Sequence, residues 1–124
     1  MKKLLAALLL GLVINLSSAQ SFLRAKQFTV GIKKQSGISW SAPTPSEVLI
    51  VVEETKINIH SKVKQEYRKV SLLEQTKTTS KWRSVDAEGK ACNIFMFTLP
   101  DYPGYLYVGV EYNDVIWYYT TTFE

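Results

Sequence analysis

The stretch that decides the fold lies near the C-terminus, where Tyr105 to Phe123 read YLYVGVEYNDVIWYYTTTF. Aromatic and β-branched residues dominate it, and such side chains favour the pleated, half-buried surface of a β-sheet. Asn113 and Asp114 interrupt the stretch at its middle, and both residue types tolerate the positive φ of a two-residue hairpin turn better than most. The stretch therefore predicts two antiparallel strands joined by a tight turn.

Counting outward from this turn gives the register of the hairpin, because successive side chains of a strand point to opposite faces. One face pairs Tyr112 with Val115, Val110 with Trp117, Val108 with Tyr119, and Leu106 with Thr121. The other face pairs Glu111 with Ile116, Gly109 with Tyr118, and Tyr107 with Thr120. The first face is almost entirely bulky and apolar, so we expect it in the core. The second face is mixed.

The mixed face holds most of the candidate binding residues. Tyr107 and Tyr118, with Gly109 between them, would form a shallow aromatic platform with Glu111 at its edge. Such a platform suits a sugar ring, a peptide strand or an exposed base. Trp40, from an earlier segment, is the fourth candidate. The alternative is purely structural, because aromatic pairs across strands stabilise a sheet by roughly 0.2–1 kcal/mol each.

Apolar patterns typical of strands recur along the rest of the chain, and helical periodicity is almost absent. We expect further strands at residues 22–33, 47–53, 56–61, 65–75, 81–85 and 90–99, and a Gly-, Ser- and Pro-rich loop at residues 35–46. The apolar members of the first strand are Phe22, Phe28, Val30 and Ile32, and in the fourth Val70 and Leu72 share a face. About eight strands with short connections predict an all-β antiparallel meander. It would form a closed or partly open barrel, with a two-sheet β-sandwich as the alternative.

The N-terminal segment MKKLLAALLLGLVINLSSAQ has the layout of a bacterial secretory signal peptide. Two lysines precede an apolar run, and the small residues that follow occupy the positions that a signal peptidase recognises for cleavage after Ala19. The apolar run is shorter than the roughly 20 residues that a membrane-spanning helix needs, and no long apolar segment follows. We expect residues 1–19 to be a cleaved leader and residues 20–124 a single β-domain without a membrane span. The mature protein would then be periplasmic or secreted.

The charge and the cysteine content argue against a nucleic-acid partner and an internal disulfide. Removal of the leader would leave 15 − 2 = 13 basic residues against 11 acidic ones, a net charge of +2. Nucleic-acid binding needs a more concentrated basic surface, so we expect no nucleic-acid partner. Cys92 is the only cysteine, which excludes an internal disulfide. It alternates with Ile94 and Met96, a pattern typical of a small buried apolar residue.

The sequence carries no recognisable catalytic or metal-binding motif, and we assign no catalytic residue, metal ligand or cofactor. His60 is the only histidine, and a structural zinc site needs about four protein ligands. No G-x-S-x-G turn and no Gly-rich phosphate loop is present. The expected function is that of a non-catalytic binding or envelope-assembly module for an unidentified protein, glycan or small apolar ligand. Two alternatives remain, a secreted protease or lysozyme inhibitor that uses the loop at 35–46, and a small hydrolase that uses His60 or a carboxylate pair.

Overall fold

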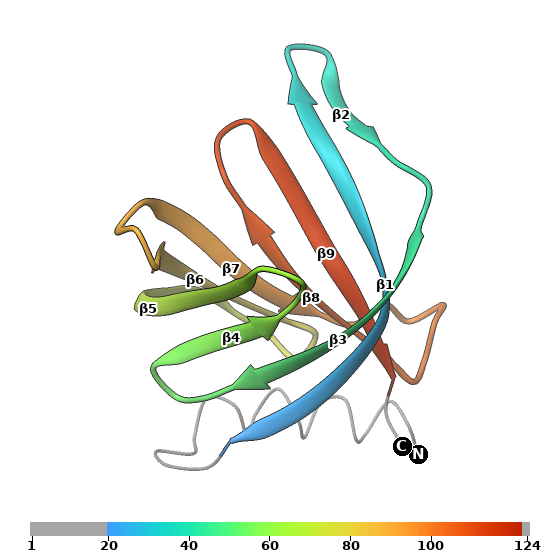
Figure 1. Ribbon diagram of the computed structural model, residues 1–124. Helices are drawn as coiled ribbons and strands as arrows, with labels where there is room; N and C mark the ends of the chain where they lie inside the picture. Colours follow the sequence, from blue (N-terminus) through green and yellow to red (C-terminus); the bar gives the residue numbers. More distant parts are fainter. Residues whose placement is uncertain (1–19, 123–124) are drawn as a thin grey trace.

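The computed structural model describes residues 20–122, so the predicted signal peptide lies outside the described residues. The regular elements in this range are nine β-strands (Figure 1). They are β1 (Ser21–Lys34), β2 (Gly37–Trp40), β3 (Thr44–Val52), β4 (Lys56–His60), β5 (Lys64–Gln75), β6 (Thr79–Asp86), β7 (Ala91–Phe97), β8 (Tyr105–Glu111) and β9 (Val115–Thr122). Among residues 20–122 there is no helix of the length and apolarity that a membrane crossing needs.

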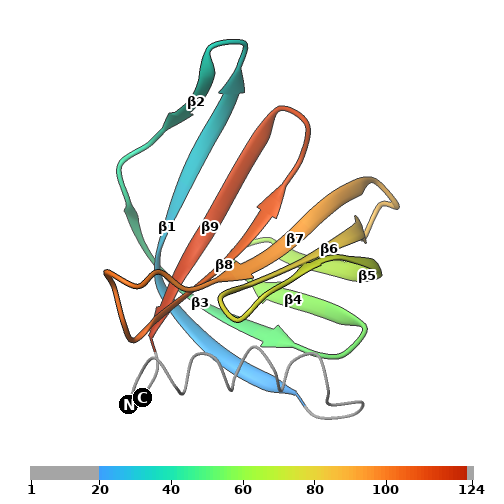
Figure 2. The ribbon, with the colours of Figure 1, turned by 180° about the vertical axis from the view of Figure 1, so that it is seen from behind.

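The sheet closes on itself. Strand β1 pairs with β3, each later strand pairs antiparallel with the next, and β9 returns to pair with β1. Eight strands thus form a closed antiparallel barrel, which confirms the predicted all-β barrel. The ninth strand, β2, pairs only with the end of β1, and the β1–β2 hairpin projects beyond the neighbouring strands (Figure 2).

The β8–β9 hairpin has the predicted register. Val108 pairs with Tyr119, Gly109 with Tyr118 and Val110 with Trp117. The amide of Tyr112 donates to the carbonyl of Val115 at 2.8 Å and closes the turn. However, no residue other than glycine has a positive φ in the described chain, so this turn does not use the predicted left-handed conformation. The alternation of side chains, rather than the turn conformation, sets the register.

The barrel centre is packed rather than hollow. Its buried cluster takes side chains from all eight barrel strands. The fully enclosed aliphatic members are Ile50, Ile57, Ile59, Ile94, Met96, Leu106, Val52, Val108 and Val110. Cys92 is a buried free thiol beside Ile94 and Met96, as predicted. A ligand must therefore bind at the outer surface or at an end of the barrel.

Strand β1 departs from the prediction at its first residues. Phe22 is 63% exposed, whereas Leu23 and Ala25 are buried. The register of β1 shifts between Ala25 and Gln27 against both neighbouring strands. This bulge adds one residue and reverses the alternation, so Phe28 returns to the inner face and packs on the core. The apolar residues Phe22 and Phe28 therefore lie on opposite faces of β1, although strict alternation would place them on the same face.

The segment 35–46 is not the predicted loop, because it contains β2 and the first residues of β3. Gly31 in β1 explains the pairing. A Cβ atom at Gly31 would lie 2.6 Å from Ile38 and 2.9 Å from the ring of Trp40, so both side chains rest on the bare backbone of β1. The exposed inhibitory loop expected from the sequence is therefore largely strand.

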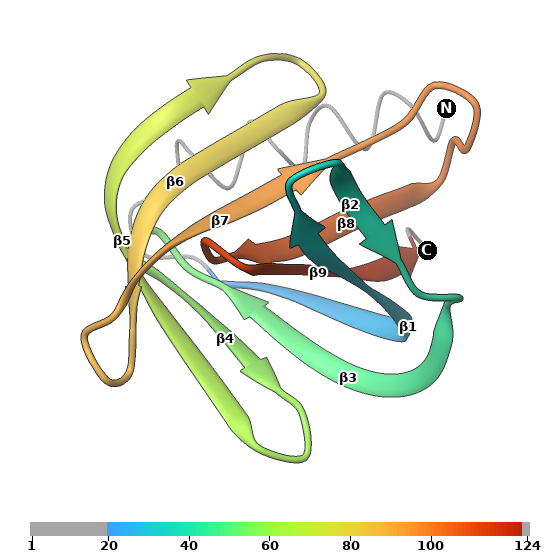
Figure 3. The same cartoon turned by 90° about the horizontal axis from the view of Figure 1, so that it is seen from above.

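Strand β5 has two halves. Its first half pairs with β4 through Arg68, and its second half continues beside β6 alone (Figure 3). The register against β6 shifts twice in the second half, and Val70, Leu72 and Leu73 are exposed there. Val70 and Leu72 consequently lie outside the core. Bulges of this kind bend an unpaired edge and discourage pairing with another chain.

Candidate binding surface on the outside of the barrel

The outward faces of β7, β8 and β9 carry a set of aromatic side chains that we call the outer aromatic layer. The pairing register places two neighbouring rows of side chains across these strands. One row contains Phe97, Tyr107, Thr120 and Gln27, and the next contains Phe95, Gly109, Tyr118 and Thr29. The layer consists of Phe95, Phe97, Tyr107 and Tyr118 with Trp40 of β2.

The rings of the layer pack against one another. Phe97 stacks on Tyr107 with centroids 4.9 Å apart and planes at 15°. Tyr118 meets Tyr107 edge-on at 5.7 Å and Trp40 at 5.6 Å. Such pairs contribute about 0.5–1.5 kcal/mol each beyond the area that they bury. The layer is therefore a second apolar cluster, separated from the core by the barrel wall.

Gly109 makes room for this packing. A Cβ atom at Gly109 would lie 2.0 Å from the ring of Phe95. The ring thus lies directly over the backbone of β8, and Phe95 is 9% exposed although it points away from the core. The sequence places Gly109 between two tyrosines of the mixed face, but this pattern does not predict which ring covers it.

A groove of about 450 Å³ runs along one side of the outer aromatic layer. We call it the outer groove. Its floor and walls come from β1, β7, β8, β9, the β2–β3 link and the β7–β8 turn, and they comprise Gln27, Thr29, Pro43, Phe97, Leu99, Tyr102, Tyr105, Tyr107, Tyr118 and Thr120. None of these residues carries a formal charge at neutral pH. Burial raises the pKa of Tyr107 further above its ordinary value. The groove therefore offers rings, hydroxyl groups and one amide.

Three of the four predicted binding residues meet in this region. Tyr107 and Tyr118 line the groove, and Trp40 packs on the far side of Tyr118 without lining it. The sequence missed the walls formed by Tyr102, which lies in the Pro- and Gly-rich segment 100–104, and by Tyr105, which is the first residue of β8. Both are well exposed. The available signal was an aromatic residue in a turn directly before an aromatic strand.

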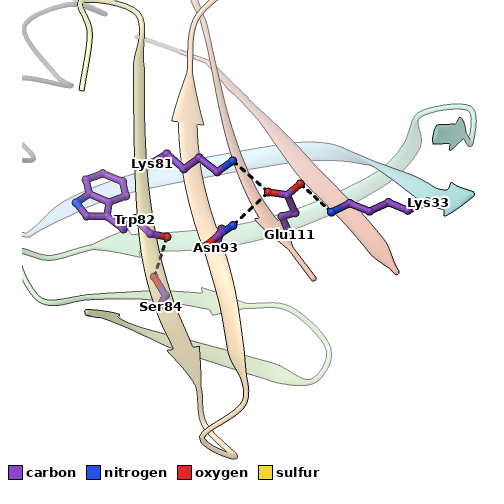
Figure 4. Close-up of polar contacts among 6 residues, drawn as sticks. All are labelled: Lys33, Lys81, Trp82, Ser84, Asn93 and Glu111. Carbon is purple, nitrogen blue, oxygen red and sulfur yellow. Dashed lines mark hydrogen bonds and ion pairs between the residues drawn. The ribbon is translucent and has the colours of Figure 1, made fainter. Parts of the chain in front are cut away.

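Glu111, the fourth predicted residue, lies outside the groove in a polar network (Figure 4). Its carboxylate accepts from Lys33 at 2.8 Å and from Asn93 at 3.4 Å, and it lies 3.3 Å from the ammonium of Lys81. Burial alone would raise the pKa of Glu111, but these donors more than compensate and hold it below its ordinary value. Glu111 thus connects β8 to β1, β6 and β7 and has its oxygens occupied.

His60 and Cys92 lie on different strands and in different surroundings. His60 is exposed at the end of β4. Burial raises the pKa of Cys92 to about 11, which keeps the thiol protonated at neutral pH. Within residues 20–122 no cluster of three or more His, Cys, Asp or Glu side chains could hold a metal ion. No protein-family model, curated protein or solved structure matched this chain.

Proposed function

We propose that this protein is an exported, non-catalytic binding module that holds an uncharged glycan in the outer groove. One observation carries the proposal: ten residues line a groove of about 450 Å³, none is charged, and half of them are aromatic. The barrel has its own packed core. The aromatic side chains on the outside of the barrel are therefore not needed to fill its core.

The chemistry of the groove suits a sugar. A pyranose ring presents an apolar face of C–H groups and a rim of hydroxyls, so it can stack on an aromatic ring and exchange hydrogen bonds at its edge. Tyr102 and Tyr105 offer exposed ring faces at the wall of the groove. Thr29, Thr120 and Gln27 offer hydroxyl and amide groups along the floor. Binding sites commonly combine apolar walls with a few convergent polar groups in this way.

The groove is also preorganised. Phe97, Tyr107 and Tyr118 already pack on one another, and Thr29 and Thr120 are buried in the sheet. Binding costs less when the contacting side chains are ordered beforehand. A site of this kind does not need to fold around its ligand.

The test is calorimetric titration of the mature protein with cellohexaose, maltohexaose and N-acetylchitohexaose. We expect at least one of these neutral oligosaccharides to bind. Replacing Tyr102 by Ala should weaken that binding roughly 10-fold, which corresponds to about 1.4 kcal/mol for the loss of one stacked ring. Tyr102 is 57% exposed, so its removal should leave the melting temperature almost unchanged.

Phe22→Ala is the matched control, because Phe22 is similarly exposed but does not line the groove. It should bind the oligosaccharide as tightly as the unmodified protein. The proposal fails if none of the three oligosaccharides binds. It also fails if binding survives unchanged when Tyr102 and Tyr105 are both replaced by Ala.

A further inference from the structure

The floor of the outer groove lies where β1 and β9 close the barrel. The pairing of these two strands sets Gln27 opposite Thr120 and Thr29 opposite Tyr118, and all four residues line the groove. Thr29 and Thr120 are only 5% and 8% exposed. Their hydroxyl groups therefore lie at the bottom of the groove, beneath its aromatic walls.

The β-bulge in β1 puts Gln27 and Thr29 on this floor. Leu23 and Ala25 belong to the core cluster, so strict alternation would send Gln27 and Thr29 inward as well. The register shift between Ala25 and Gln27 adds one residue and turns both side chains outward. Bulges are frequent next to functional sites, where they redirect a side chain. The two polar side chains thus reach the groove because the strand is irregular at this point.

The polar side chains of the floor have no partner within residues 20–122. On the inner face of β9, the hydroxyl of Thr121 donates to the carbonyl of Leu106 at 2.8 Å. The side chains of Gln27, Thr29 and Thr120 make no such bond in that range. The two hydroxyls are not fully enclosed either, so a ligand in the groove can reach them. Polar groups of buried residues usually have a partner, and the unpartnered hydroxyls of Thr29 and Thr120 therefore point to a bound molecule.

The walls of the groove stand well above this floor. Tyr102 and Tyr105 are exposed, and Leu99 and Pro43 add aliphatic surface beside them. A sugar ring that stacks on the exposed tyrosines carries its own hydroxyls one bond from the ring, close to the rim. To reach the buried hydroxyls it needs a longer side group that passes between apolar walls and carries polar atoms. An acetamido group has this form, because it combines a carbonyl acceptor and an N–H donor with a methyl group.

Building on the glycan-binding function proposed above, we propose that the glycan consists of N-acetylated amino sugars and that the groove floor holds the acetamido group. Its carbonyl oxygen accepts from the hydroxyls of Thr29 and Thr120, and its N–H donates to the side-chain carbonyl of Gln27. Its methyl group lies against the apolar walls. No lining residue is charged, so a free amine or a carboxylate on the sugar would find no opposite charge in the groove. The lining therefore favours the neutral, acetylated form.

The test compares N-acetylchitohexaose with cellohexaose, which has the same β-1,4-linked chain but a hydroxyl in place of each acetamido group. In calorimetric titrations of residues 20–124, N-acetylchitohexaose should bind roughly 10-fold more tightly, in line with two neutral hydrogen bonds. Thr29→Val and Thr120→Val keep the shape of the side chain and remove the hydroxyl. Each should weaken the binding of N-acetylchitohexaose roughly 5-fold and change that of cellohexaose by less than about 2-fold.

Thr79→Val is the matched control. Thr79 of β6 pairs with Phe97 but does not line the groove, so its replacement should leave both affinities unchanged. A second measurement needs no variant and gives the answer if the valine proteins do not fold. In saturation-transfer NMR with the unmodified protein, the acetamido methyl protons of N-acetylchitohexaose should receive the most saturation. Saturation centred on the ring protons of the sugar would contradict the proposal.

The outcomes separate this proposal from the glycan-binding function itself. If cellohexaose binds as tightly as N-acetylchitohexaose, or if Thr29→Val and Thr120→Val both keep full affinity for N-acetylchitohexaose, the floor does not hold an acetamido group. The glycan site itself then stands. If neither of these oligosaccharides binds and maltohexaose does not bind either, the glycan-binding function fails as well.

Discussion

At Gly109 the absence of a side chain decides how the outside of the barrel is built. The ring of Phe95 occupies the space that a Cβ atom would need, and Phe97, Tyr107 and Tyr118 continue the packing from there. Glycine in a strand usually weakens it, since it has no side chain to pack and a larger entropy to lose. Here the neighbouring ring supplies the missing contact. The outer aromatic layer therefore depends on one small residue.

Replacing Gly109 by Ala should destabilise the protein, because the new methyl group must displace the ring of Phe95. Overpacking of this kind costs about 1–3 kcal/mol, and urea unfolding measures it. The double variant Gly109→Ala with Phe95→Leu removes the clashing ring atoms. In a protein that already carries Phe95→Leu, adding Gly109→Ala should lower the free energy of unfolding by less than it does in the unmodified protein. If Gly109→Ala lowers the free energy of unfolding equally in both proteins, the contact with Phe95 is contradicted.

Glu111 should make stability depend on pH in the acid range. Its pKa is lowered in the folded state, so its contribution is complete above the unfolded value of about 4.3 and is lost as the pH falls through the folded value. The urea midpoint of the unmodified protein should therefore fall more steeply below pH 5 than that of Glu111→Gln. Glu88→Gln is the control, because Glu88 makes no ion pair among residues 20–122. If the urea midpoints of the unmodified protein and of Glu111→Gln fall equally steeply below pH 5, this assignment is refuted.

At the level of elements, the features predicted best from the sequence are the strand registers and faces that depend on residues close together in the chain. The β8–β9 register follows from one turn and a strict alternation, and the inner face of β7 follows from the alternation of Cys92, Ile94 and Met96. The bulge in β1 depends on β3 and β9, which lie elsewhere in the chain, so no local pattern indicates it. The pairing of β2 with β1 is local, but it was missed because residues 35–46 are rich in Gly, Ser and Pro. The groove walls at Tyr102 and Tyr105 were missed because the groove itself is formed by distant segments. Their place beside β9 and β1 exists only once the barrel is closed.

Strand β5 should show two levels of protection in amide hydrogen exchange. Residues 64–68 pair with β4, and Tyr67 and Arg68 pair with β6 as well, whereas residues 70–75 pair with β6 alone and the register shifts twice between residues 69 and 74. Amides whose hydrogen bonds open in local fluctuations exchange faster than those that need global unfolding. Mass spectrometry of deuterium uptake should find residues 70–75 the faster half. Uniform protection along β5 would argue against the one-sided pairing.

At the scale of the whole molecule, closure between β1 and β9 joins the first and last described strands and completes the outer groove. Thr29 and Gln27 of β1 complete the floor of the outer groove beside Tyr118 and Thr120 of β9. No disulfide supports this closure, because the chain has one cysteine. The packed aliphatic centre instead stabilises the strands whose outer faces form the proposed glycan site.

The proposed binding of a neutral glycan on the outside of this closed barrel is tested most directly by an NMR titration of ¹⁵N-labelled residues 20–124 with the oligosaccharide that binds most tightly. The largest shifts should occur at the amides of Thr29, Tyr102 and Thr120, while those of Gln65 and Val115, which do not line the outer groove, stay in place. Shifts centred on Gln65 and Val115, or none anywhere at saturating oligosaccharide, would contradict binding in the outer groove.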